Sequence, residues 1–154
     1  MATALVEIYG EQPVSFEAIV LPPGYRPSDD EEFMGPLQQA YFHRKLVDWK
    51  EAIVEESRAT MAQLQVDTLR EPDLADRASS ETDWGIELRT RDRQRKLIAK
   101  IDAALRRIDE GEYGYCDKTG DPIGLKRLIA RPVATMTLEA QEAHERRERV
   151  SRDD

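Results

Sequence analysis

The stretch Glu71-Pro72-Asp73-Leu74-Ala75-Asp76-Arg77-Ala78 lies near the middle of a chain of 154 residues. On each side of it stands a long segment without proline, in which apolar residues recur at helical spacing. A proline among acidic residues between two such segments is typical of a turn, because proline disfavours helix in the residue before it. The stretch 71–78 is therefore predicted to form the tip of an antiparallel helical hairpin.

The first arm of this hairpin is predicted to run from Gly35 to about Arg70. Pro36 favours a helix start, because a proline at the first helical position needs no N–H partner and already has a helical φ. A helix of this length would be roughly 50 Å long. Its seam residues are large and apolar near the base and give way to serine and threonine toward the tip. The apolar positions are Leu46, Trp49, Ile53, Met61 and Leu64.

The second arm is predicted to run to about Glu110, where Gly111 ends it. Heptad-like spacing over two arms of nearly equal length predicts a two-helix coiled coil whose open ends return to the same place. The first arm is net acidic from Asp48 to Asp67 and the second arm is basic, which favours antiparallel pairing modestly. The inward stripe of the second arm is predicted to contain Trp84, Leu88, Arg91, Arg95, Ile98, Ile101, Leu105 and Ile108.

Three further segments complete the predicted organisation. Glycine and proline crowd residues 111–135, which predicts a compact, turn-rich module rather than a long helix. Residues 136–154 are very polar and are predicted to form a C-terminal helix, from Leu138 to about Arg149, and a tail. Residues 1–34 contain several prolines and are expected to pack on the module. The fold class predicted is mainly α, with a coiled-coil hairpin at 35–110.

One short element is predicted within the first 34 residues. Phe16, Ile19 and Val20 would share one helical face there, and their apolar side chains favour packing over a free tail.

Composition and charge exclude several classes of protein. Charged residues make up 35% of the chain and aromatic residues only 6%, which suits long solvated helices better than one large core. The formal net charge of −8 disfavours nucleic acid as the main partner, because phosphate binding needs a basic surface. A basic strip on the second arm, between Arg89 and Arg107, instead suggests docking to a partner of mixed charge.

Cys116 is the only cysteine, so an internal disulfide is excluded and a reducing compartment is favoured. The sequence has neither an apolar run of transmembrane length nor the start of a signal peptide. We therefore expect a cytoplasmic protein.

Three motifs, in order between about residues 36 and 148, resemble the DksA/TraR family. Asp73-Leu74-Ala75-Asp76-Arg77-Ala78 resembles its Asp-x-x-Asp-x-Ala tip, and Leu88-Arg89-Thr90-Arg91-Asp92-Arg93-Gln94-Arg95-Lys96-Leu97-Ile98 resembles its second arm. Three further groups of residues resemble the C-terminal module of the family. They are Gly111-Glu112-Tyr113-Gly114-Tyr115-Cys116, then Gly120 with Ile123-Gly124, and Arg127-Leu128-Ile129-Ala130-Arg131-Pro132.

This resemblance implies a regulator of transcription and not an enzyme. Proteins of the family bind bacterial RNA polymerase directly, through its secondary channel, and do not bind promoter DNA specifically. With the alarmone ppGpp they modulate initiation in the stringent response. A monomer is expected.

The resemblance also implies which residues act. Asp73, Asp76 and Ala78 would be the effectors at the tip, although both acids also suit a helix N-terminus. Arg93 would contact polymerase. Leu97, Lys100 and Arg131 would line a ppGpp site shared with polymerase, and Lys100 and Arg131 would supply charge to its phosphates. A further basic position of that site is Gln141 here, which implies a weaker ppGpp response.

The chain departs from the family at its zinc site. The family has two CxxC pairs, whereas this chain keeps Cys116 and has Thr119, Thr137 and Ala140 at the other three positions. Structural Zn²⁺ needs four thiolate or imidazole ligands, so we expect no zinc. Packing must then hold the module, through Tyr113, Tyr115, Ile123, Leu125, Leu128 and Val133.

Two alternatives remain open at this stage. A transcript-cleavage factor of the secondary channel would have a similar hairpin, with tip carboxylates that hold Mg²⁺. A coiled-coil adaptor would have no role at polymerase.

Overall fold

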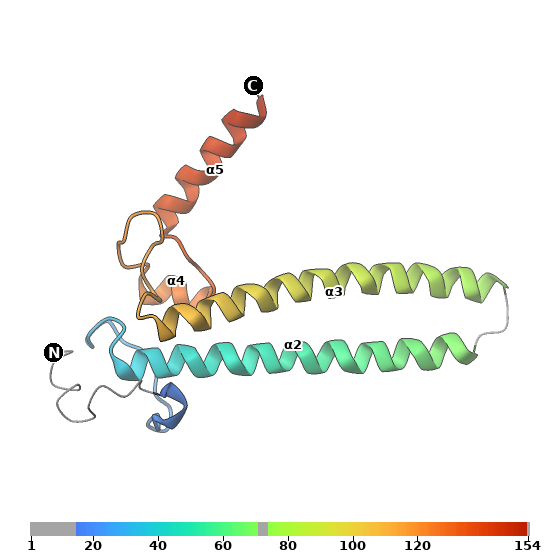
Figure 1. Cartoon of the computed structure of the whole chain (residues 1–154), viewed down its shortest axis with the longest axis horizontal. Helices are drawn as coiled ribbons and strands as arrows, with labels where there is room; N and C mark the ends of the chain where they lie inside the picture. The colour runs from blue at the N-terminus through green and yellow to red at the C-terminus, as the bar shows by residue number, and fades with distance from the viewer. Residues whose placement is uncertain (1–14, 71–73, 154) are drawn as a thin grey trace.

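The computed structural model describes residues 15–70 and 74–153, with the helix backbone alone for 67–70 and 74–80. Figure 1 shows two long helices side by side along the long axis of the molecule, with the other elements at one end. The predicted fold class, mainly α with a long two-helix hairpin, is confirmed. The elements are the 3-10 helix η1 (Phe16–Ala18) and the helices α2 (Pro36–Arg70), α3 (Leu74–Asp109), α4 (Leu125–Ala130) and α5 (Leu138–Asp153).

Local rules explain where the two arms begin and end at the base. Helix α2 begins at Pro36, directly after Gly35, as the proline predicts. Helix α3 ends at Asp109, and Gly111 follows with a φ of 75°, a left-handed conformation that glycine adopts without steric cost. The N–H of Gly111 donates to the carbonyl of Ile108 at 3.1 Å, which satisfies one carbonyl of the last turn.

The hydrophobic core lies where the base of the hairpin meets the C-terminal module. Phe42 and Leu46 of α2, Ile101 and Ile108 of α3 and Leu128 of α4 are at most 1% exposed. Burying one such side chain stabilises a fold by about 1.5–3 kcal/mol, so most of the stability arises at this end. The other buried apolar residues include Met34, Ile53, Ala104, Tyr113, Cys116, Ile123, Leu125 and Ala134.

Toward the tip the two arms bury little surface. Among the side chains of residues 54–66 and 81–100, none is buried. Leu88 is 56% exposed, and Arg91 and Arg95 are exposed as well. Leu88, Arg91, Arg95 and Ile98 of the predicted inward stripe line the space between the arms, but they are not buried there, because heptad spacing sets which residues face the other arm and not how closely the arms approach.

The N-terminal segment lies against α2 near its base. The ring of Phe16 in η1 is 6.1 Å from the ring of His43 on α2, measured between centroids. The helix η1 ends at Ala18 and the chain continues in an extended conformation. Val20 is 89% exposed, so the prediction that it shares a packed helical face with Phe16 and Ile19 is wrong.

Residues Phe33 and Met34 reach the C-terminal module. The Phe33 ring meets Tyr115 edge to face, with centroids 5.5 Å apart. Gly114 has a φ of 92°, and a Cβ at this position would lie 2.8 Å from Cγ of Met34. A glycine is therefore required here both by the backbone conformation and by the close approach of Met34.

The module itself is built from turns and the one short helix α4. An isolated antiparallel bridge joins Tyr115 and Pro122, and the N–H of Asp117 donates to the carbonyl of Thr135 at 2.9 Å. The prediction that apolar packing builds this module is confirmed. All six residues named for it belong to the core or pack against it, namely Tyr113, Tyr115, Ile123, Leu125, Leu128 and Val133.

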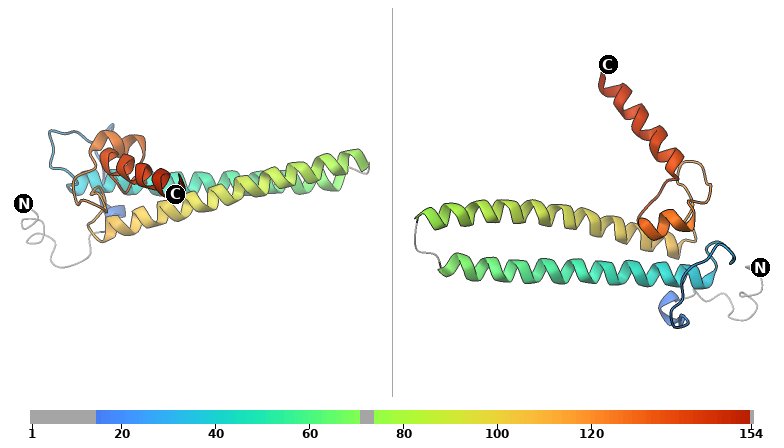
Figure 2. Two further views of the ribbon diagram at one scale, coloured as in Figure 1. Left: turned by 90° about the horizontal axis from the view of Figure 1, so that it is seen from above. Right: turned by 180° about the vertical axis from the view of Figure 1, so that it is seen from behind.

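Helix α5 leaves the base at an angle to the hairpin and projects into solvent (Figures 1 and 2). It begins at Leu138 as predicted and continues to Asp153, beyond the predicted end near Arg149. None of its residues is buried. In the described part of the chain, no helix is both long enough and apolar enough to cross a membrane.

Candidate functional site

The tip of the hairpin is the first part of the candidate site. Asp73 lies outside the described residues. Asp76 and Ala78 follow within the first turns of α3, which begins at Leu74. An acidic residue in a first turn interacts favourably with the partial positive charge of the helix N-terminus. The roles of Asp73, Asp76 and Ala78 stay predictions.

Arg93 lies in the exposed part of α3. Its side chain is exposed and its Nη2 donates to Oγ1 of Thr90 on the preceding turn, at 3.4 Å. Arg93 and Arg89 line a shallow surface hollow together with Leu88 and Asp92. An arginine beside an exposed leucine suits contact with a partner protein, but the polymerase contact stays a prediction.

The four positions of the predicted ppGpp site lie on three different elements. Leu97 on α3 is partly buried and packs against the core, whereas Lys100 on the same helix is exposed. Arg131 is exposed and caps α4, where its N–H donates to the carbonyl of Arg127 at 2.7 Å. Gln141 lies in the first turn of α5, and its amide donates to Glu145 at 2.9 Å. Within residues 15–70 and 74–153, no hydrogen bond or ion pair joins any two of Leu97, Lys100, Arg131 and Gln141.

At the positions of the family's zinc ligands, this chain has a buried thiol surrounded by hydrogen-bond donors. Cys116 is 3% exposed. Burial by itself raises the pKa of its thiol, but hydrogen bonds from the Thr119 hydroxyl and from the main-chain N–H groups of Thr137, Lys118 and Thr119 outweigh burial and lower it to about 7. The sulfur therefore accepts hydrogen bonds from the segments that would otherwise supply ligands.

The second pair of zinc positions has become the start of a helix. Oγ1 of Thr137 accepts a hydrogen bond from the N–H of Ala140 at 3.2 Å, and its carbonyl accepts one from Gln141 at 2.9 Å. This is the geometry of a helix N-cap, which satisfies an N–H that has no partner inside the helix. Ala140 packs against the core. Thr137 thus caps α5 and Ala140 packs in the module, and neither role requires a metal.

The donor set does not fit zinc. One thiolate is present where four ligands are needed, and threonine hydroxyls and an alanine methyl group are not zinc ligands in structural sites. No group of three or more His, Cys, Asp or Glu side chains in the described residues is placed to hold a metal ion. The expectation of a metal-free module rests on this donor set.

Hydrogen bonds to main-chain carbonyls hold the module instead. Nη2 of Arg107 donates to the carbonyl of Tyr115 at 2.6 Å, and Nε of Arg127 donates to the carbonyl of Met136 at 2.9 Å. The hydroxyl of Tyr113 donates to the carbonyl of Pro132 at 2.7 Å, and burial raises the pKa of this hydroxyl. The bond from Arg107 connects α3 to the first half of the module, and the bond from Arg127 connects α4 to the segment before α5. The bond from Tyr113 connects the two halves of the module, which the zinc ligands of the family would also join.

Sequence reasoning did not single out these arginines. Each looks like any other surface cation in the sequence, because its acceptor is a carbonyl of another segment. Lys45 is a third example, since its Nζ donates to the carbonyl of Ile129, 84 residues away, at 3.0 Å. Only the tertiary structure reveals such pairs.

Two family models match the chain. The model "DnaK suppressor protein DksA, N-terminal domain" matches residues 38–108, which covers most of the hairpin. The model "Prokaryotic dksA/traR C4-type zinc finger" matches residues 111–146, although this chain has only one of the four cysteines.

Named relatives agree with these models. The chain is 67% identical over 130 residues to the "RNA polymerase-binding transcription factor DksA" of Caulobacter vibrioides, which covers 84% of this chain and 92% of that protein. It is 38% identical over 125 residues to the protein of the same name from Escherichia coli K12, with coverage of 81% and 83%.

A solved structure extends the agreement to the fold. The transcription factor DksA2 from Pseudomonas aeruginosa superposes with a TM-score of 0.70 at 41% sequence identity, over 76% of this chain and 90% of that chain. The hairpin and the module are thus similar in sequence and in structure to those of named proteins. On these grounds the chain belongs to the DksA/TraR family.

Proposed function

We propose that this protein binds bacterial RNA polymerase through the secondary channel of the enzyme and, together with ppGpp, modulates transcription initiation. The observation that carries the proposal is the 67% identity over 130 residues to a protein named RNA polymerase-binding transcription factor DksA. The protein would act in the cytoplasm as a monomer, without catalysing a reaction and without binding specific DNA. The net charge of −8 supports a protein partner over DNA.

The shape of the hairpin supports entry into a channel. Helix α3 has 36 residues, so it spans roughly 50 Å. The buried core lies at the opposite end from the tip, which lets the base remain at the rim while the tip extends inward. In this proposal the tip residues Asp73, Asp76 and Ala78 destabilise open promoter complexes, and Arg93 contributes to binding along the arm.

The ppGpp site is proposed to form from Leu97, Lys100 and Arg131 when polymerase supplies the rest. Lys100 and Arg131 are exposed cations that suit the phosphates of ppGpp, and Leu97 packs against the core at the level of the base. Gln141 is neutral where the family has a basic residue, so the response to ppGpp would be weaker than in relatives that keep it.

The experiment that tests the function is transcription in vitro from a stable-RNA promoter, with purified polymerase and with or without ppGpp. We expect the wild-type protein to inhibit and ppGpp to enhance the inhibition. Asp73→Asn should leave polymerase binding within about twofold, because it removes one charge from a large contact surface, but should abolish inhibition. Asp83→Asn is the matched control, since Asp83 is an exposed aspartate ten positions further along the chain, on helix α3.

Three results would contradict the proposal. Normal inhibition by Asp73→Asn would exclude the tip as effector. Failure of the wild-type protein to copurify with polymerase would favour an adaptor role instead. Shortening of the RNA in stalled complexes would favour the cleavage-factor alternative.

A further inference from the structure

The packing of the hairpin changes abruptly about halfway along its length. On the base side, Leu46 and Ile53 of α2 and Ile101 of α3 are at most 7% exposed. On the tip side, Val54 is already 36% exposed and Leu88 is 56% exposed. The local stability of a region follows the apolar surface that it buries, so the two halves of the hairpin differ in what holds their arms together.

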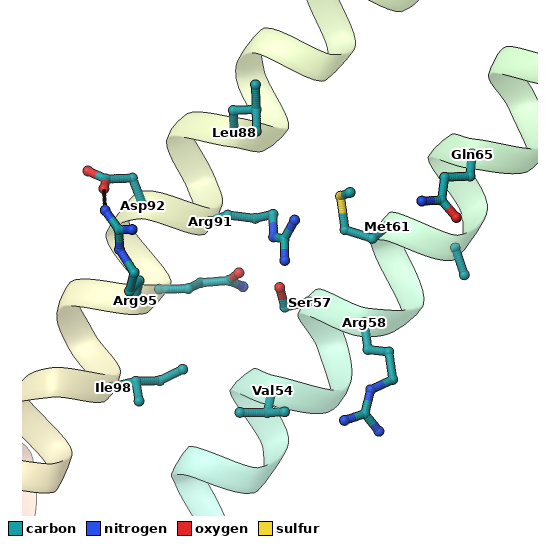
Figure 3. A pocket seen from close by; sticks show the side chains of 12 residues that line it. Val54, Ser57, Arg58, Met61, Gln65, Leu88, Arg91, Asp92, Arg95 and Ile98 are labelled. Carbon is teal, nitrogen blue, oxygen red and sulfur yellow. Dashed lines mark hydrogen bonds and ion pairs between the residues drawn. The ribbon is translucent and has the colours of Figure 1, made fainter.

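A cavity of about 810 Å³ lies between the arms at this change. Figure 3 shows Arg91 on α3 pointing across the gap toward Ser57 and Met61 on α2. The side-chain oxygen Oε1 of Gln94 is buried and has no hydrogen-bond partner in the described part of the chain. Charged and amide groups thus occupy seam positions where a coiled coil normally places apolar side chains. The lining residues also include Val54 and Ile98.

The helices themselves are weakened at the same level. Oγ1 of Thr60 donates to the carbonyl of Glu56 at 2.9 Å, and Oγ1 of Thr90 donates to the carbonyl of Ile86 at 3.1 Å. Such bonds to the residue four positions back compete with the helical hydrogen bonds and often bend helices. Gly85 lies nearby on α3, and a Cβ there would meet no atom within 4 Å, so packing does not require this poor helix former.

We propose that Ser57, Arg91 and Gln94, with Met61 beside them, form a largely polar layer that acts as a hinge between two halves of the hairpin. The half on the tip side bends and unfolds at this layer while the half at the base stays folded. The base half is fixed by its buried core, whereas the arms beyond the layer share no buried side chain among those described. This inference concerns the free protein and does not depend on the proposed function.

The two tryptophans report on the two halves separately. Trp49 packs against the core of the base, and Trp84 lies on α3 on the tip side of the layer. In Trp84→Phe, fluorescence would follow the base alone, and in Trp49→Phe it would follow the tip side alone. We expect the urea midpoint reported by Trp84 to lie about 1 M or more below the midpoint reported by Trp49. Coincident midpoints would overturn the proposal, because they indicate one cooperative unit.

Substitutions in the layer test its location. Arg91→Leu and Gln94→Leu place apolar side chains in the cavity, and the second also removes the unpaired acceptor. Both should bring the Trp84 midpoint toward the Trp49 midpoint. Arg89→Leu is the matched control, because Arg89 is an exposed residue of the same helix that does not line the cavity. An equal shift with all three variants, or no shift with the two in the layer, would contradict a hinge at this position.

Hydrogen exchange separates a hinge from simple fraying of the tip. A hinge predicts a step, with the amides of 57–66 and 84–95 exchanging about tenfold or more faster than those of 42–53 and 98–108. Fraying predicts a gradual rise in rate along each arm toward the tip, and such a gradient would overturn the proposal. In Gln94→Leu the ratio of the exchange rates on the two sides of the layer should fall by about tenfold. The substitution removes a buried polar group without a partner, which destabilises the arms at the layer.

Discussion

Lys50 on α2 and Asp102 on α3 form an ion pair across the hairpin, with Nζ and Oδ1 2.7 Å apart. The pair lies on the base side of the polar layer, and each side chain is 38% exposed. It links residues 52 positions apart in the chain and therefore favours one register of the two arms. Solvent reaches both charges, so the pair contributes to register more than to stability.

A double-mutant cycle of Lys50→Met and Asp102→Asn should measure a small coupling. We expect about 0.5 kcal/mol from urea unfolding at low salt, because partly exposed ion pairs contribute this order of free energy. The coupling should fall toward zero in 1 M salt, where screening extends over only about 3 Å. A coupling that is unchanged by salt would contradict an electrostatic origin.

Removal of the Arg127 side chain should destabilise the C-terminal module. Arg127→Met loses the hydrogen bond from Nε to the carbonyl of Met136 and leaves that carbonyl without its partner. The free energy of unfolding should fall by about 1–3 kcal/mol, measured by urea denaturation. Lys126→Met is the control, since Lys126 is exposed and should change stability by less than about 0.5 kcal/mol.

Chelators should leave the stability of the protein unchanged. The module is held by packing and by hydrogen bonds to carbonyls, and only Cys116 remains at a ligand position, so we expect no metal whose removal could unfold it. The melting temperature should agree within about 1 °C with and without EDTA, because a lost structural metal would shift it by far more. Stoichiometric zinc in the purified protein would show this expectation to be wrong.

Stability should rise with pH through the titration of Cys116. Burial raises the pKa of this thiol, but hydrogen bonds from Thr119, Thr137 and Lys118 lower it to about 7, below the value of about 8.5 for an unfolded cysteine. The folded state therefore holds fewer protons between these values, and the stabilisation is complete above pH 8.5 and lost as the pH falls through 7. Urea midpoints measured from pH 6 to 9 should rise for the wild type.

The matched variants for this pH profile are Cys116→Ala and Thr119→Val. The first should remove the contribution of the thiol to the slope, and the second should reduce it by removing the hydroxyl donor. A slope that is identical in all three proteins would assign the pH dependence to other groups.

Restoring a basic residue at Gln141 should strengthen the response to ppGpp. Gln141→Lys adds a cation that can contact a phosphate, so the concentration of ppGpp for half-maximal effect should fall by about three- to tenfold. Gln141→Leu, which also loses the hydrogen bond to Glu145 but adds no charge, should not lower it. An equal gain from both variants would mean that the loss of that hydrogen bond, and not charge, is responsible.

The helix boundaries at the base of the hairpin could be predicted from the sequence because they depend on local effects. Pro36 and Gly111 act through their own backbone conformation, and α2 begins and α3 ends where these residues predict. The family motifs likewise identified the positions that lack zinc ligands. The new role of Thr137 as an N-cap was not predicted, because capping depends on where the preceding chain leads.

Contacts between distant segments could not be predicted in this way. The heptad pattern correctly placed Arg91 and Leu88 toward the other arm, but the width of the gap between the arms depends on the packing of whole helices. The carbonyl acceptors of Arg107 and Arg127 are equally invisible in the sequence. Asp73 lies outside the described residues, and the roles of Arg93, Leu97, Lys100 and Arg131 stay predictions.

The nearly equal length of the two arms, 35 residues in α2 and 36 in α3, makes the hairpin a molecular ruler. Each residue adds about 1.5 Å to a helix, and a heptad adds about 10 Å while keeping the same face toward the partner arm. The depth that the tip reaches is therefore encoded in residue number rather than in residue identity. Insertions or deletions are compatible with this fold only when they occur in both arms together, whereas single substitutions on the outer faces leave the reach unchanged.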